Sequence, residues 1–154
     1  MRTEFVFHIL NKHHQQLLEL VETCPEDQRL TIPEGFKNNL HWHIGHVLTV
    51  TEFHVFGLSE HTPGQVLPAN YQQLFAYGTK PSDWQEEPPA WDLLIAQLKD
   101  QRNQLHVLLD GKLDVPVKEN FLKAETFGEL LVSTTLHLVD HLGFVSALLK
   151  VLKR

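Results

Sequence analysis

The sequence is poor in cysteine and in basic side chains. Cys24 is the single cysteine of 154 residues, which excludes an intrachain disulfide and a cysteine-based structural zinc site and fits a reducing compartment. The sequence has 13 Lys and Arg residues and 19 Asp and Glu residues, which gives a formal net charge of −6. The basic surface typical of proteins that bind nucleic acid or anionic membranes is therefore missing.

Long apolar runs are also lacking. No run approaches the ~18 residues that a membrane-spanning helix needs, and the first residues do not have the charged-then-apolar plan of a signal peptide. We therefore expect a cytoplasmic protein with no nucleic-acid or membrane partner.

The apolar residues that are present follow helical spacing. Four stretches, about 3–23, 39–58, 89–111 and 126–152, repeat apolar residues with a period near 3.6. Pro25 and Gly111 mark two helix ends, and Thr126 with Glu129 forms a capping box. A short helix at about 70–76 and a weak strand signal at 114–117 complete the pattern. The predicted fold is all-α, a four-helix bundle with long crossover connections, as a single domain over residues 1–154.

The connection 59–89 is roughly thirty residues long, and connections of that length in compact domains more often cover a site than not. We expect it to lie over or beside the cavity that holds His46, held by aromatic residues such as Tyr77 and Trp84. The alternative is a plain crossover between two parallel helices.

Histidine is the abundant residue type, with 11 copies; it is the commonest metal ligand and carries protons near neutral pH. His137 and His141 are neighbours at i and i+4 in the middle of an apolar stripe on the last helix, a spacing that can chelate one ion. His46 lies at the centre of the corresponding stripe on the second helix.

The three histidines leave a fourth coordination position open, the pattern of a catalytic His₃ zinc site. Burying them without partners costs roughly 1–3 kcal/mol each. The alternative is a set of hydrogen-bonded core side chains, and periodicity leaves both interpretations open. His43 and His54 fall at the edges of the same helix's stripe, and His41 on its far side, where we expect solvent.

Other polar residues are candidates for chemistry around this site. The segment 137–141 lacks the Glu of the zincin motif and has Asp140 where the inverted motif has Glu. Because a compact bundle offers no cleft for polypeptides, peptidase activity is disfavoured. Asp140 is a candidate base, a carboxylate that supports the ligands, or a solvated helix residue.

His13, on the apolar stripe of the first helix, is a second candidate base or a packing residue. Arg102 falls on the stripe of the third helix, where it would bind a substrate carboxylate or else extend to solvent or pair with an acidic residue. Trp42 either lines the pocket beside His46 or packs in the core.

Two segments resemble a known family. Residues 39–46 (NLHWHIGH) resemble the N-x-x-W-h-x-G-H signature of the DinB-like superfamily, which includes the YfiT-like predicted metal-dependent hydrolases, and residues 137–143 (HLVDHLG) resemble its H-x-x-x-H-x-G motif. The order and separation of the motifs extend the resemblance over nearly the whole chain. Phe144 stands where the family often has Gln.

The resemblance implies a four-helix bundle with a divalent ion, zinc or nickel, held by His46, His137 and His141. Relatives include S-transferases and an isomerase that use low-molecular-weight thiols such as bacillithiol or mycothiol, and dimers are common among them. We therefore expect a metal-dependent enzyme, a homodimer, that transfers a small thiol or hydrolyses a small substrate. The alternatives are a non-catalytic, metal-containing stress-response or small-molecule-binding protein, and a metal-free scaffold.

Overall fold

The computed structural model describes residues 2–58 and 66–153, and within these ranges the regular structure is helical, with no strand. The long helices are α1 (Thr3–Glu22), α2 (Leu40–Glu52), α4 (Trp91–Leu109) and α5 (Phe127–Leu152). The short ones are η1 (Glu26–Gln28), the π-helical turn η2 (Phe53–Gly57), α3 (Tyr71–Phe75) and η3 (Pro81–Asp83). The predicted all-α class is confirmed.

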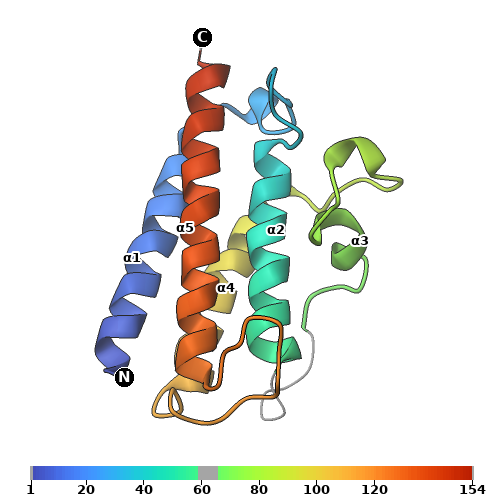
Figure 1. Ribbon diagram of the computed structural model, residues 1–154. Coiled ribbons are helices and arrows are strands. Elements are labelled where there is room, and N and C mark those ends of the chain that lie inside the picture. The colour runs from blue at the N-terminus through green and yellow to red at the C-terminus, as the bar shows by residue number, and fades with distance from the viewer. Residues whose placement is uncertain (1, 59–65, 154) are drawn as a thin grey trace.

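The four long helices lie side by side, with α1 and α5 running in one direction and α2 and α4 in the other (Figure 1). α5 contacts α1 and α2, while α3 and α4 both contact α2. α2 is thus enclosed by three other helices, and all but one of its 13 residues are buried. A helix buried all round has no polar face to give to water.

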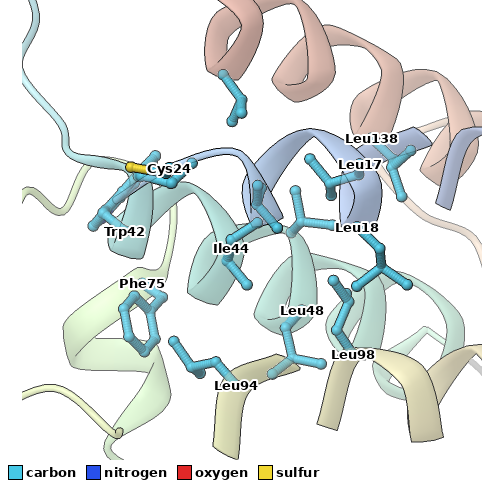
Figure 2. Close-up of a cluster of buried hydrophobic side chains, with 14 of the residues drawn as sticks. Leu17, Leu18, Cys24, Trp42, Ile44, Leu48, Phe75, Leu94, Leu98 and Leu138 are labelled. Carbon is cyan, nitrogen blue, oxygen red and sulfur yellow. The ribbon is translucent and has the colours of Figure 1, made fainter. Parts of the chain in front are cut away.

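The apolar core around α2 is built from every long helix. Figure 2 shows Ile44 and Leu48 of α2 in one buried cluster with Leu94 and Leu98 of α4 and with Phe75 of α3. A second cluster joins the first half of α1 and the last turns of α4 to the start of α5. Its most buried members include Leu10, Leu105, Leu109, Phe127 and Leu130.

Helix starts follow the local signals in the sequence. The Asn39 side chain accepts a hydrogen bond from the Trp42 backbone N–H at 2.8 Å, as an N-cap does. The Thr126 hydroxyl accepts from the Glu129 N–H at 3.4 Å. The strand signal at 114–117 gives only an isolated antiparallel bridge, between Pro116 and Thr126.

The buried face of α1 differs from the prediction. His14 is 1% exposed, whereas His13 is partly exposed and its Nδ1 lies 2.9 Å from Gln16 Oε1. The stripe that packs inward follows Phe7, Leu10, His14, Leu17 and Val21. Because apolar residues occupy both sides of this stripe, their spacing alone could not fix the rotation of the helix.

The same rotation error occurs on α4. Gln101 is the buried residue, and its Nε2 donates to the Leu48 carbonyl at 2.9 Å. Arg102 is half-buried at the side of the helix. Of the two positions that the sequence leaves open for Arg102, the structure shows the one outside the interior, because the amide of Gln101 satisfies an α2 carbonyl at that level without burying a charge.

α5 is long and apolar enough to cross a membrane by length and composition, with a hydropathy of 1.4 in its most apolar window. Core helices of soluble proteins pass the same test. Of that window, 28% is buried in the fold, and Leu136 and Phe144 of α5 are among the exposed large apolar residues.

Burial of His14 predicts a pH-dependent stability. Burial, followed by the charge of Arg102, lowers its pKa from 6.5 to about 4. The unfolded chain therefore binds a proton between these two pKa values that the native state does not. The free energy of unfolding should fall by roughly 3 kcal/mol on this account as the pH drops from about 6.5 to about 4. Urea unfolding of the His14→Leu variant should show a weaker pH dependence in this window.

The control is the His8→Leu variant, because His8 lies exposed on the same helix. It should keep the pH dependence of the unmodified protein. Equal slopes for the unmodified protein and the His14→Leu variant would contradict the prediction.

Candidate metal centre

Three histidines meet between α2 and α5. His46 of α2 and His137 and His141 of α5 each offer one ring nitrogen, and these nitrogens all lie within 4.8 Å of one another. His46 Nε2 and His137 Nε2 are 3.1 Å apart. The structure thus brings together the three residues predicted as ligands, and the group could hold one metal ion.

His46 is oriented from behind by the backbone of α3. Its Nδ1–H donates to the carbonyl of Phe75 at 2.6 Å, and the Trp42 ring stacks on it at 4.4 Å with an interplanar angle of 15°. Because Nδ1 carries the proton, Nε2 keeps its lone pair and faces His137. A carbonyl partner of this kind fixes the tautomer of a metal-binding histidine.

Gly45 makes this arrangement possible. A Cβ at Gly45 would overlap the ring of Phe75, so only glycine lets α3 approach α2 closely enough for the Phe75 carbonyl to reach His46. The glycine one residue before the ligand thus has a steric role.

The partner of His141 is His43, which the sequence pattern placed at the edge of the apolar stripe of the second helix. His43 is 4% exposed, and its Nδ1 lies 2.9 Å from His141 Nδ1. For His141 to offer Nε2 to an ion, its Nδ1–H must donate to the unprotonated Nδ1 of His43. His43 then holds the ring of His141 as the Phe75 carbonyl holds that of His46.

The electrostatics favour neutral imidazoles. Burial, with a smaller contribution from neighbouring histidines, lowers the pKa of His137 and of His43 to about 4 and that of His141 to about 2. Burial also lowers the pKa of His46. All four rings are therefore unprotonated at neutral pH, the state that a metal ion requires of its ligands.

The histidine group opens on a large cavity of about 1160 Å³. Its walls come from the segment before α2, from α2 and α5, and from the connection between α3 and α4; the lining includes Ile32, Phe36, Lys37, Asn38, Trp42, His43, Tyr77, Thr79, Lys80, Ser82, Asp140 and Phe144. The prediction that the 59–89 connection lies beside this cavity is confirmed for residues 77–82, while 59–65 fall outside the described residues.

Hydrogen bonds from two tryptophans hold the connection between α3 and α4 in place beside the cavity. The Trp84 indole N–H donates to the carbonyl of Leu74 at 2.9 Å, and the Trp42 indole N–H donates to the hydroxyl of Thr79 at 2.9 Å. Trp84 therefore fixes the fold of the connection, whereas Tyr77 is 95% exposed at the cavity mouth.

The remaining candidate residues divide into two groups. Trp42 and Asp140 line the large cavity, with Asp140 exposed. His13 and Arg102 are not part of its lining or of the smaller cavity described below. Phe144 of α5 is 56% exposed at the cavity wall.

His41 is not in solvent as predicted. It is 5% exposed, and its Nε2 lies 2.8 Å from the carbonyl of Pro89. The chain entering α4 covers this side of α2, and Trp91 packs against the His41 ring at 5.8 Å. His41 was misplaced because the prediction assumed that α2 has a solvent face.

Replacing either α5 ligand should remove the metal without unfolding the chain. His137→Ala and His141→Ala leave the buried leucines of α5 in place, including Leu138 and Leu148, so helix packing does not depend on the ion. Metal analysis should show that neither variant retains a divalent ion that the unmodified protein binds, and circular dichroism should show retained helix. Complete unfolding of either variant would identify a structural metal site instead.

Removing the partner of His141 should weaken metal binding. In His43→Ala the ring of His141 loses its hydrogen bond, and comparable losses cost about 10–100-fold in metal affinity. Competition with a chromogenic chelator measures this change. His8→Ala, which removes an exposed histidine of α1, is the matched control, and equal affinities for the two variants would refute the role of His43.

Comparison with known proteins agrees with the two motifs. The family described as the DinB superfamily matches residues 9–145. A comparison with curated proteins returns no match. The match spans α2 and the two α5 histidines, so the resemblance expected from the sequence is confirmed: the chain belongs to the DinB superfamily.

Proposed function

We propose that this protein is a divalent-metal-dependent enzyme, with zinc or nickel held by His46, His137 and His141, that transfers a low-molecular-weight thiol to a small electrophile. In this proposal the four long helices serve as a four-helix-bundle scaffold. The convergence of three neutral imidazoles on the wall of a large cavity carries the proposal. Three protein ligands leave a coordination position for a substrate.

A divalent ion bound here would act as a Lewis acid, lowering the pKa of a thiol or water ligand. The protein's own contribution is to hold the three rings. The Phe75 carbonyl and His43 fix the rotation of two of them. Trp42 and Phe144 supply apolar walls beside the rings.

The charges around the cavity favour an anionic substrate. The chain as a whole has a formal net charge of −6, yet Lys37 and Lys80 line this cavity and Asp140 is the one acidic residue in its described lining. Small cellular thiols carry carboxylates, which suit these ammonium groups. Lys80 also forms an exposed ion pair with Asp83 at 3.6 Å, a pairing weak enough for a substrate to replace.

The position of Asp140 favours thiol transfer over hydrolysis. A hydrolase needs a base positioned to take a proton from water, and Asp140 is exposed at the cavity wall rather than held against the imidazoles. The absence of a buried carboxylate from the described lining favours, as second candidate, a non-catalytic protein that binds a small thiol.

The test uses metal-stripped protein reconstituted with Zn²⁺ or Ni²⁺, a carboxylate-bearing thiol, and monochlorobimane as electrophile. The thiol sulfur forms a bond to carbon, chloride leaves, and the thiol proton passes to buffer. Thioether formation should depend on the metal and be lost in His46→Ala. Thiol binding without metal-dependent thioether would support the binding protein, and metal-dependent ester hydrolysis alone would overturn thiol transfer.

A further inference from the structure

A second, smaller cavity adjoins the histidine group. Its volume is about 440 Å³, and His46, His137 and Tyr77 line both this cavity and the larger one. We propose that the smaller cavity is a binding site for a small, uncharged, largely apolar molecule with one hydrogen-bonding group. That this molecule is the electrophile of the reaction rests on the proposed function; its binding does not.

The walls of the smaller cavity are apolar. They include Val50, Phe53, Ala76, Phe121 and Leu122, and the described lining contains no Lys, Arg, Asp or Glu. Phe53 and Phe121 stack at 6.3 Å between ring centroids with an interplanar angle of 18°. Both rings are partly exposed, so they form an aromatic edge at which a flat apolar group can enter.

The contrast with the larger cavity sets the ligand class. Lysines line the larger cavity, and none lines the described part of the smaller one. A charged ligand would enter the smaller cavity without a counter-ion, which is unfavourable. The cavity volume lies within the range of small-molecule sites, which combine apolar walls with a few polar groups.

Polar side chains also line the smaller cavity, and one of them lacks a hydrogen-bond partner among the described residues. Thr49 lines the cavity and is 1% exposed, and its Oγ1 has no hydrogen-bond partner among the described residues. Buried hydroxyls are normally satisfied, so within this proposal Thr49 is the residue whose hydroxyl is free to bond to a ligand in the cavity. His54, Gln72, Tyr77 and Ser133 are further polar residues of the lining, besides His46 and His137 of the histidine group.

The backbone changes form at this wall. α2 ends at Glu52 and continues as the π-helical turn Phe53–Gly57, which carries both Phe53 and His54. Such turns interrupt α-helices frequently at functional sites. His54 is 7% exposed, and its ring lies 6.1 Å from that of His137. The widened turn therefore places a polar ring and an aromatic ring at one cavity.

The experiment measures binding of 2-naphthol to the metal-stripped protein by its fluorescence, with naphthalene-2-sulfonate as the charged analogue. We expect saturable binding of 2-naphthol and, for the binding that Ser133→Phe blocks, at least tenfold weaker binding of the sulfonate. Ser133→Phe should fill the cavity and abolish binding. Val132→Phe adds the same ring at the adjacent position of α5, which does not line the cavity, and should bind like the unmodified protein.

Two further variants keep the test decisive if Ser133→Phe folds poorly. Phe121 is 65% exposed, so Phe121→Ala should fold normally and bind 2-naphthol several-fold more weakly. Thr49→Val should weaken binding of 2-naphthol but not of 2-methylnaphthalene, which has no hydroxyl. Unchanged 2-naphthol binding in Phe121→Ala, or equal binding of naphthol and sulfonate, would overturn the proposal. Since no metal is present, failure of thiol transfer leaves this result unaffected.

Discussion

The structure depends on one constraint: α2 packs against three other helices with nearly all of its residues buried, and yet four histidines and a glutamate lie in α2 or in the turn that follows it. A polar group without access to water must find its partner inside the protein. His41 and His46 are bonded to carbonyl groups of the connection between α2 and α4, and His43 to His141 of α5. Glu52 accepts two backbone N–H bonds from the start of the same connection.

These bonds explain why a long connection is positioned accurately beside the histidine group. A loop held only by apolar contacts can slide, whereas a carbonyl that must meet a buried ring nitrogen has a fixed place. The Phe75 carbonyl and the Thr79 hydroxyl are both held in this way, the second by Trp42. The segment between Phe75 and Thr79, which forms part of the cavity wall, is therefore held to α2 by hydrogen bonds at both of its ends.

Much of this could be predicted from the sequence, because local signals decide it. The bounds of the helices follow from the helical spacing of the apolar residues and from the capping residues. The grouping of His46, His137 and His141 follows from their positions on two helices. The rotation of α1 and α4 could not be predicted, because His14 and Gln101 are buried by what faces them and not by their own polarity.

The hydrogen-bond partners of His46 and His141 could not be predicted from the sequence for a different reason. The carbonyl of Phe75 meets His46 across 29 residues, and His43 meets His141 across 98, so both depend on tertiary packing. Gly45 was the available clue, since a glycine inside a helix usually marks a packing reason. It indicates close approach of another segment but not which segment.

The single thiol of the chain has a practical consequence. Cys24 is 3% exposed and belongs to the same buried cluster as Trp42 (Figure 2), and burial raises the pKa of its thiol. An alkylating reagent can therefore reach sulfur only when this end of the core opens. Trp42 in turn stacks on His46. The rate at which Cys24 is alkylated therefore measures how often this part of the core opens, and such openings also loosen the packing that supports the histidine group.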